Sequence, residues 1–395
     1  MKQTPITVLC GFLGSGKTTL LRRWSHTDGL DDVAIIVHDF SDFGVDAELL
    51  ADDETPPQIG ELVGRVAALH GVHAREQLYD SVGGALSGIA DLEPPAPLVL
   101  CESTGAARPW PLIQALTQDH RFFLRHFVVT VDALNLHRDF SDGRVFIGDA
   151  ALGADPALRR AAEILAEQIL FASVLVLTKV DLLPRSVVDA QVAVLQKLKP
   201  GTPLGLSAEA GLELPQLEAA PAPVPAELQA LASQFGLDQH APTPTTMASV
   251  SLRDVRPFHP QRLYDAVQTQ LGTGVYRTKG FLWLASRPAQ VLLWQQSGSQ
   301  IGLEIRGLWR SEVVREREGA LLPEEREKLG TALESSHPVF GDRRNELTSI
   351  GDRAACETFR EALRAALCTD EEVAAWQAGK AFPDPWPQSV REVEY

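Results

Sequence analysis

The sequence has little positive charge and no long apolar segment. Lysine and arginine together number 36 against 52 aspartate and glutamate residues, which gives a formal net charge of −16. A field of that sign repels polyanions, so non-specific nucleic-acid binding is not expected. No apolar run approaches the length of a membrane span, so a membrane partner is not expected either.

Cysteine is also scarce, and the four cysteines show no CxxC spacing. This argues against a disulfide framework and, with the short apolar stretch at the N-terminus, predicts a cytoplasmic protein. Cys10 and Cys101 each end an apolar run. Small buried side chains are the ordinary explanation, and a two-thiolate metal site is the alternative.

Apolar runs alternate with helical stretches through the first half of the chain. Five runs rich in Val, Ile and Leu are continuous rather than alternating, which is typical of strands buried on both faces. They are Ile6–Cys10, Val33–Val37, Pro97–Cys101, Phe127–Val131 and Val174–Leu177. The pattern predicts an α/β fold of the P-loop NTPase type, with a mostly parallel, doubly wound sheet.

The second half of the chain follows a different pattern. Proline and alanine concentrate in residues 214–246, which predicts a linker with one helix in it. Shorter, aromatic-rich runs follow, and they predict antiparallel strands with helices between them. We therefore expect a first domain over 1–213, a linker over 214–246, and a smaller α+β domain with an extended tail over 247–395.

The clearest motif is the segment GFLGSGKT at Gly11–Thr18, a full match to GxxxxGK[ST] between an expected strand and an expected helix. Glycines let the backbone N–H groups turn inward and form a nest for phosphate oxygens, and the helix adds its N-terminal dipole. Lys17 is expected to reach the β and γ phosphates during catalysis, and Thr18 to bind Mg²⁺. The expected nucleotide-binding residues here are Gly11, Gly14, Ser15, Gly16, Lys17, Thr18 and Thr19.

The sequence TKVD, directly after the fifth apolar run, predicts which base the bound nucleotide carries. Asp181 can accept hydrogen bonds from guanine N1 and N2, which adenine does not offer, and the stem of Lys179 can lie along the base. The backbone of Ser207 and Ala208 can donate to guanine O6. Thr178 stands where asparagine is usual. The placement favours GTP over ATP.

Two carboxylates and a glycine complete the expected phosphate side. Glu102 and Gly105 lie in CESTGAARP, after the third apolar run, where Glu102 is expected to position the attacking water and Gly105 to donate its N–H to the γ phosphate. Asp39, at the end of the second run, is a candidate Mg²⁺ ligand and catalytic support. Helix capping is the alternative role for both carboxylates.

In these motifs the chain resembles the CobW-type GTPases, in particular their YciC-like zinc-metallochaperone branch. The CobW-type GTPases are related to UreG and HypB. The resemblance rests on GFLGSGKTTLL, CESTGAARP, TKVD, GFLWLASRP and GDRRNEL, and it extends to the FPDPWP tail. It implies a CobW C-terminal-type second domain. It also implies that GTP hydrolysis is coupled to delivery of a divalent metal, often zinc, to a client metalloprotein.

The chain departs from that family at the metal site. The family's CxCC motif is absent from Glu61–Leu78, where no cysteine occurs. His70 and His73 stand near the equivalent place, and His38 replaces the usual asparagine before Asp39. Three imidazoles can form a zinc site. The alternative is that His70 and His73 are solvated or capping residues on a helix face and that the cargo site has been lost.

Three functions are therefore open at this point. The first is a GTPase that handles a metal, and the second is a GTP-gated binding module without metal cargo. The third is an ATP-dependent kinase or ligase, since those enzymes also use a P-loop. Nothing in the sequence marks an arginine finger, so slow intrinsic turnover is expected, and Arg108 is the nearest candidate.

Overall fold

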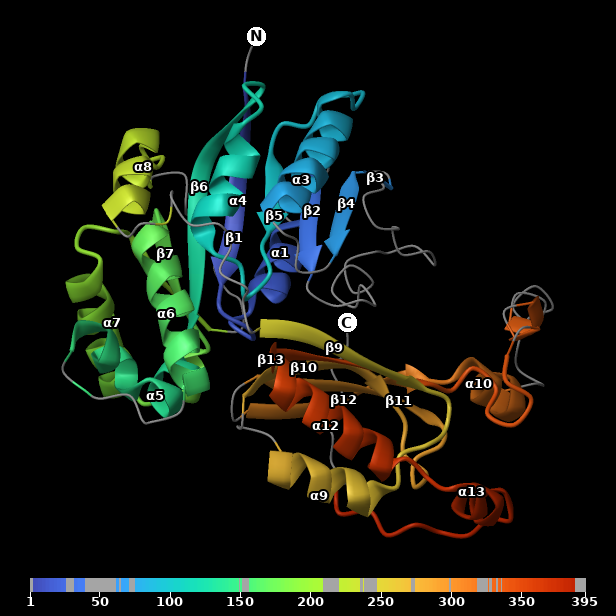
Figure 1. Cartoon of the computed structure of the whole chain (residues 1–395). Coiled ribbons are helices and arrows are strands. Elements are labelled where there is room, and N and C mark those ends of the chain that lie inside the picture. The colour runs from blue at the N-terminus through green and yellow to red at the C-terminus, as the bar shows by residue number, and fades with distance from the viewer. Residues whose placement is uncertain are drawn as a thin grey trace. The chain divides into compact units, whose positions relative to one another are not determined.

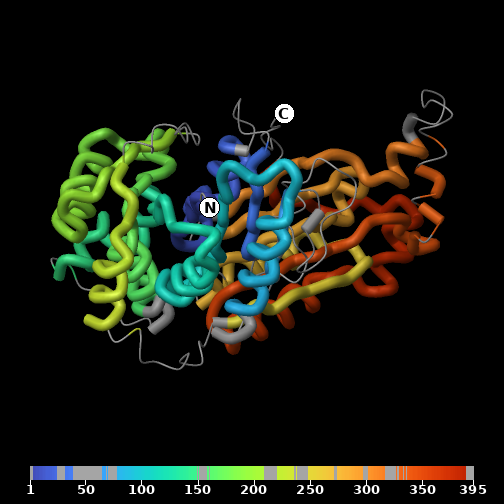
Figure 2. Tube along the Cα trace, turned by 90° about the horizontal axis from the view of Figure 1, so that it is seen from above, coloured from blue at the N-terminus to red at the C-terminus, as the bar shows by residue number. Residues whose placement is uncertain are grey.

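The computed structural model of the chain divides it into two compact units, Met1–Thr245 and Thr246–Tyr395. Each is one continuous stretch of chain, as the colours of Figure 2 show. The structure describes residues 3–25, 32–39, 62–63, 65–70, 75–148, 150, 156–208, 220–234, 237, 247–270, 274–297, 300–317, 326, 329–331, 333–334 and 336–387. No helix in these ranges is long and apolar enough to cross a membrane.

Unit 1 contains an eight-stranded sheet with the order β3-β4-β2-β5-β1-β6-β7-β8 (Figure 1). Seven strands are parallel, and β3 pairs antiparallel with β4. The strands are β1 (Thr4–Gly11), β2 (Ala34–Asp39), β3 (Leu62–Val63), β4 (Val66–His70), β5 (Val99–Glu102), β6 (Phe122–Asp132), β7 (Val174–Thr178) and β8 (Leu204–Ser207). The predicted mostly parallel sheet is confirmed.

Helices cover both faces of this sheet. In Figure 1, α3, α4 and α6 lie in front of the strands and α1 lies behind them. The helices are α1 (Lys17–Ser25), α3 (Arg75–Ala90), α4 (Pro109–Thr117), α5 (Ala133–Asp139), α6 (Pro156–Phe171), α7 (Arg185–Leu198) and α8 (Pro225–Gln234), with short 3₁₀ turns at Ser141–Ile147 and Val180–Leu182. Helix α8 falls within the Pro/Ala-rich segment.

The face behind the sheet is closed by α1. Leu20, Leu21 and Trp24 of α1 pack against Leu9 of β1, and Val37, Leu100 and Val128 of neighbouring strands belong to the same buried cluster. Trp24 is fully buried. Burial of large apolar side chains is the main source of stability in such a layer. It also fixes the start of α1, and therefore Lys17 and Thr18, against the end of β1.

Unit 2 is built on a five-stranded antiparallel sheet of order β12-β11-β10-β13-β9, with α9 and α12 on one face (Figure 1). The elements are β9 (Met247–Asp254), α9 (Pro260–Gln270), β10 (Val275–Leu282), β11 (Gln290–Ser297), β12 (Gln300–Leu308), α10 (Arg310–Arg317), β13 (Asn345–Asp352), α12 (Arg353–Ala366) and α13 (Asp370–Gln377). Phe359 and Leu363 of α12 are buried with the apolar residues of the sheet.

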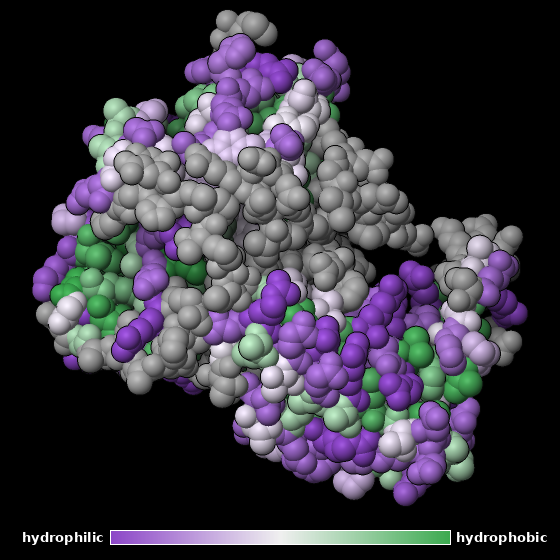
Figure 3. All heavy atoms as spheres, viewed as in Figure 1, coloured by the Kyte–Doolittle hydropathy of each residue, from purple (hydrophilic) through white to green (hydrophobic). Residues whose placement is uncertain are grey.

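The extended tail of unit 2 is anchored to this core. Arg287 Nε donates to Asp384 Oδ2 at 2.7 Å, and Trp386 is buried with its ring edge-on to Trp294. Hydrophilic residues cover much of the visible surface of unit 2, with small groups of hydrophobic residues between them (Figure 3). Trp386 of the tail therefore belongs to the core of unit 2.

Four of the described strands have no counterpart among the predicted apolar runs: β3, β4, β8 and β13. The segment of β13, NELTSIGD, is mostly polar in sequence, yet its residues Asn345–Gly351 are buried. Asn345 explains part of this, because its side chain accepts from Trp283 N at 2.9 Å and donates to Arg256 O at 2.6 Å. Polar strands of this kind carry no alternating apolar pattern and escape prediction.

Strand β6 buries a histidine whose charge state should make unit 1 sensitive to acid. His126 is 3% exposed, and burial, helped by Arg125, lowers its pKa from 6.5 to about 4. Because the folded pKa lies below the unfolded one, the unfolded chain takes up the proton first as the pH falls from 6.5 to 4. We expect the free energy of unfolding to fall over that window by on the order of 1–3 kcal/mol from this residue.

The measurement is urea unfolding of the wild type and of His126→Gln at pH 7 and pH 5. The variant should lose less stability between the two pH values, whatever its stability at pH 7. An equal loss in both proteins would mean that other groups carry the acid sensitivity.

Candidate functional site

The segment between β1 and α1 forms a loop that bends around its own backbone N–H groups. Gly11, Gly14 and Gly16 have φ values of 143°, 76° and 88°, all in the range that favours glycine. Ser15 N donates to Phe12 O at 3.2 Å, and Leu20 N donates to Gly16 O at 3.0 Å, which continues the loop into α1. This is the conformation in which such a loop cradles phosphate oxygens.

The loop packs closely on the end of β6. A β-carbon at Gly11 would overlap the carbonyl and hydroxyl oxygens of Thr130, so only glycine fits there. The Ser15 and Thr130 hydroxyls lie 2.6 Å apart, and Thr130 Oγ1 donates to Cys10 O at 3.2 Å. Thr130 therefore holds both ends of the loop.

Lys17, Thr18 and Glu102 come together at the carboxyl ends of β1 and β5. Lys17 is buried, and its Nζ donates to Gly11 O at 2.8 Å and to Phe12 O at 3.2 Å. Thr18 Oγ1 donates to Glu102 Oε1 at 2.7 Å. One hydroxyl and one carboxylate thus lie side by side beside the loop, and oxygen ligands of this kind suit Mg²⁺.

The segment that follows Glu102 lies against the same loop. Ser103 N donates to Leu9 O at 2.9 Å, which extends the pairing of β5 with β1. A β-carbon at Gly105 would lie 2.7 Å from Leu13 N and 2.8 Å from Leu13 Cα. Gly105 therefore lies against the backbone of the phosphate loop.

The TKVD residues follow β7 and are tied to the phosphate loop. Thr178 Oγ1 donates to Ser15 O at 2.9 Å and also lies 3.2 Å from Val131 O. The hydroxyl of Thr178 thus joins the two loops even though the usual asparagine is absent. Lys179 has a left-handed backbone, with φ 57°.

The side chain of Lys179 is held in turn by β6. Its Nζ lies 2.5 Å from Asp132 Oδ2, while Asp132 Oδ1 accepts from the backbone of Leu134 and Asn135 at the start of α5. Asp181 is exposed after this lysine, and Ser207 and Ala208 lie at the end of the adjacent strand β8. The residues expected to bind the base therefore occupy one edge of the sheet.

Two of the candidate cargo-metal histidines, His38 and His70, lie in β2 and β4, which pair with each other in the sheet. His38 is buried and in register with Leu69, whereas Asp39 is in register with His70. The pairing therefore brings Asp39, not His38, beside His70. His70 is the last residue of β4, so it does not lie on a helix face, and His73 lies outside the described residues.

Within the described ranges, no three His, Cys, Asp or Glu side chains converge into a group that could hold a metal. The two cysteines near the loop do not replace the missing motif. Burial raises the pKa of the Cys10 thiol, with the Ser103 hydrogen bond opposing it, and burial together with Glu102 raises the pKa of the Cys101 thiol. Both thiols are buried, as is ordinary for small side chains within a sheet.

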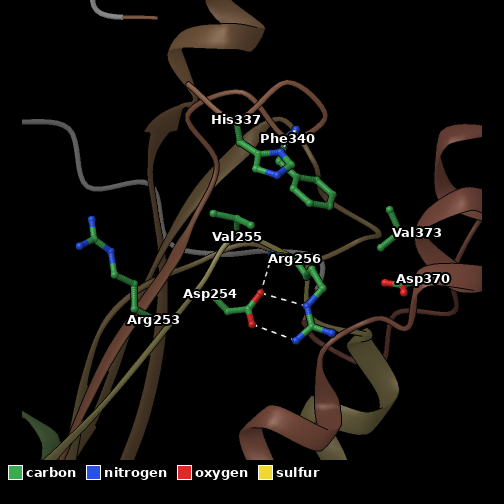
Figure 4. Close-up of a pocket in the computed structure, with 8 residues that line it drawn as sticks. All are labelled: Arg253, Asp254, Val255, Arg256, His337, Phe340, Asp370 and Val373. Atoms are coloured by element: carbon green, nitrogen blue, oxygen red, sulfur yellow. Dashed lines mark hydrogen bonds and ion pairs between the residues drawn. The ribbon is translucent and has the colours of Figure 1, made fainter. Parts of the chain in front are cut away.

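Unit 2 contains a separate cavity of about 590 Å³ (Figure 4). It is lined by Arg253, Asp254, Val255, Arg256, His337, Phe340, Asp370 and Val373. Arg256 is paired with Asp254 through two guanidinium hydrogen bonds, and the rings of His337 and Phe340 stack at 4.8 Å. None of the expected nucleotide-binding residues lines this cavity.

Three residues that hold the loops of this site in place were not predicted from the sequence: Thr130, Asp132 and Gln168. Thr130 and Asp132 end an apolar run, and the carboxyl ends of parallel strands are where ligands bind, so their position was a usable signal. Gln168 lies inside the helical segment AEQILF and is fully buried. A buried polar side chain among apolar neighbours requires a partner, but the sequence does not name it.

Known protein families match the chain separately in its two units. Residues 5–204 match the family CobW/HypB/UreG, nucleotide-binding domain, and residues 247–367 match the Cobalamin synthesis protein cobW C-terminal domain. The resemblance inferred from the motifs is confirmed by these matches.

Individual relatives are more distant. The chain is 25% identical to Zinc-regulated GTPase metalloprotein activator 1 of Dictyostelium discoideum over 94% of this chain and 81% of that protein. It is 38% identical to Zinc chaperone Rv0106 of Mycobacterium tuberculosis, over only 35% of this chain and 34% of that one. The crystal structure of Zn(II)-bound YjiA GTPase from E. coli aligns with a TM-score of 0.35 at 17% identity, covering 93% of this chain and 100% of that chain.

Thr178 offers a test of the contact between the two loops. Replacing it by valine keeps the shape of the side chain and removes the hydroxyl that donates to Ser15 O. We expect the affinity for GTP and for GDP to fall together by roughly fivefold, because a buried hydrogen bond contributes on the order of 1 kcal/mol.

Isothermal titration with both nucleotides measures this effect. Thr269→Val, which removes a hydroxyl from the exposed face of α9 in unit 2, is the matched control and should change neither affinity. Unchanged affinities in Thr178→Val would show that the hydroxyl does not support the site.

Proposed function

Because the chain belongs to the CobW/HypB/UreG family, we propose that its GTP hydrolysis is coupled to the handling and delivery of a divalent metal, zinc, to a client metalloprotein. The observation that carries the nucleotide half of the proposal is the convergence of three segments at the carboxyl end of one sheet. They are the phosphate loop, the Glu102 segment and the TKVD loop, joined by the Thr18–Glu102 and Thr178–Ser15 contacts. Such an edge is where parallel α/β sheets bind ligands.

In this proposal the glycine-rich loop and Lys17 hold the phosphates. Gly11, Gly14 and Gly16 turn the loop so that its N–H groups face the phosphate oxygens. Lys17 Nζ now donates to two carbonyls of its own loop and exchanges them for the β- and γ-phosphate oxygens when the nucleotide binds. The lysine is buried, so its charge acts at low dielectric on the transferring group.

Mg²⁺ fits the oxygen pair beside the loop. Thr18 Oγ1 is the proposed direct ligand, and Asp39 at the end of β2 supports it. When bound, the cation neutralises charge on the phosphate oxygens. Glu102, whose carboxylate already lies 2.7 Å from Thr18 Oγ1, orients the water that attacks the γ phosphate.

The proposed guanine contacts lie on the other side of the phosphate loop. Asp181 accepts from guanine N1 and N2, the backbone of Ser207 and Ala208 donates to O6, and the stem of Lys179 packs along the base. The ion pair of Lys179 with Asp132 fixes that stem. GTP is preferred to ATP because adenine presents no donor at N1.

The proposal of zinc handling is supported by the zinc named in the relatives and by the histidines of the sequence in and near β2 and β4. His70 and His73 are the proposed cargo ligands, with His38 as a third candidate on the neighbouring strand. We further propose the cytoplasm as the compartment, on the cysteine usage of the sequence. The absence of cysteine from Glu61–Leu78 favours one alternative, a GTP-gated binding module without metal cargo.

Base selectivity is tested with Asp181→Ala. We expect GTP affinity to fall roughly tenfold to hundredfold, because two hydrogen bonds to the base are lost, while ATP affinity stays low and unchanged. Competition of GTP and ATP against a fluorescent GDP analogue measures both affinities. Asp189→Ala, an exposed aspartate on α7 that pairs with Arg185, is the control. Tighter binding of ATP than of GTP by the wild type would instead support the kinase or ligase alternative.

The metal half is tested by zinc competition with a chromogenic chelator. The wild type should bind zinc tightly and differently in the GTP-analogue and GDP states, and His70→Ala/His73→Ala should lose that binding. His120→Ala/His137→Ala, two exposed histidines of unit 1, is the control pair and should retain it. Zinc binding no higher than background in the wild type would favour the GTP-gated module without cargo.

A further inference from the structure

Two adjacent side chains of helix α6 contact the segment that follows Glu102. Gln168 is fully buried, and its Nε2 donates to Gly105 O at 3.3 Å and to Ala107 O at 3.0 Å. Two carbonyls of the segment are thus held by one side-chain amide. Gln168 lies 61 and 63 residues away from them in sequence, so only the fold brings these groups together.

Gly105 also lies against the phosphate loop. No β-carbon fits at this position, because it would meet the backbone of Leu13 at 2.7–2.8 Å. The residue proposed to contact the γ phosphate therefore meets both the loop and Gln168. The carbonyl that Gln168 binds and the N–H of Gly105 belong to two successive peptide groups joined at the Gly105 Cα, so holding the carbonyl restrains the N–H through only two backbone dihedral angles.

The end of the segment is attached to the same helix. Arg108 Nη1 lies 3.3 Å from Glu167 Oε2, and the Glu167 side chain is 12% exposed. Burial raises the pKa of Glu167, and the charge of Arg108 lowers it. Arg108, the nearest candidate for an arginine finger, is thus paired with α6.

Helix α6 also leads directly into the strand that carries the TKVD loop. Ser173 N donates to Phe127 O at 2.9 Å, and β7 begins at the next residue. One rigid helix therefore supports both the γ-phosphate side and the base side of the site. The segment around Gly105 is therefore attached to α6 at both Gln168 and Glu167.

We propose that Gln168, assisted by the Glu167–Arg108 ion pair, is a positioning residue that holds Gly105 for the γ phosphate and so sets the discrimination between GTP and GDP and the rate of hydrolysis. Gln168 acts through the peptide groups of Gly105 and Ala107 and does not contact the nucleotide. GDP lacks the γ phosphate, so its affinity is independent of this glutamine. The inference rests on the proposed GTPase function.

The test compares Gln168→Met with Gln191→Met in the full-length chain. Gln191 of α7 is a matched control, because it is also fully buried and its Nε2 also donates two hydrogen bonds, to Ala133 O at 3.0 Å and Asp142 Oδ1 at 3.1 Å. A loss of packing or hydrogen bonding alone lowers the thermal midpoint of both variants. The specific readouts are kcat for GTP and the ratio of affinities for a non-hydrolysable GTP analogue and for GDP.

In Gln168→Met we expect the analogue-to-GDP affinity ratio and kcat each to fall about fivefold to tenfold, the range expected for lost hydrogen bonds. Gln191→Met should leave both unchanged. The inference would be overturned if Gln168→Met lost affinity equally for the analogue and for GDP. It would also be overturned if Gln191→Met showed the same change in the affinity ratio. If Gln168→Met does not fold, the surface variant Arg108→Met replaces it in the test. We expect Arg108→Met to shift the affinity ratio in the same direction, and an unchanged ratio would count against the inference.

The wild-type measurement separates this inference from the function on which it rests. A wild-type chain that neither binds nor hydrolyses GTP overturns the GTPase function and the inference with it. A wild-type chain that hydrolyses GTP, with Gln168→Met indistinguishable from Gln191→Met, overturns the positioning role alone.

Discussion

Gly11 lies against Thr130, and Gly105 lies against Leu13, with no space for a side chain at either glycine. These two backbone approaches place the phosphate loop between the ends of β5 and β6, and every other feature of the nucleotide site depends on them. Glu102 reaches Thr18 because β5 runs directly beside β1. Thr178 reaches Ser15 because β7 runs beside β6, on which the loop rests.

The site is held together largely by hydroxyls and backbone carbonyls. Thr130, Thr178 and Ser15 link strand ends through short side chains that leave little room for movement. Longer charged groups lie around them: Lys179 pairs with Asp132, and Arg108 pairs with Glu167. A threonine that donates to a backbone carbonyl therefore joins the loops here, although asparagine is usual at that position.

The departure from the family motif concerns the proposed cargo rather than the nucleotide. The phosphate loop and its hydrogen-bonded partners lie at the carboxyl ends of the parallel strands, whereas the cysteines of the family motif are absent from the sequence Glu61–Leu78. The conformation of the loop depends on backbone geometry at the centre of the sheet. The proposed metal ligands are a few side chains, so they can change while the sheet is retained.

Much of the fold and of the site was predictable from local sequence. Continuous apolar runs predicted the central strands, and the GFLGSGKT segment predicted the loop, since its glycines impose a backbone that few other residues adopt. The same approach did not predict β13, because its buried residues are polar and satisfied by distant partners such as Trp283 N. It placed His70 on a helix face, whereas the residue ends a strand.

The sequence alone therefore determined the residues whose roles follow from covalent geometry and spacing: the glycines, Lys17 and Thr18, and the acidic residues at strand ends. Only the tertiary structure decided which groups meet across the sheet: Thr178 with Ser15, Lys179 with Asp132, and Gln168 with the carbonyls of Gly105 and Ala107. The physical reason is that these contacts join residues 47–163 positions apart. Their pairing is set by strand order and register, which no local pattern specifies.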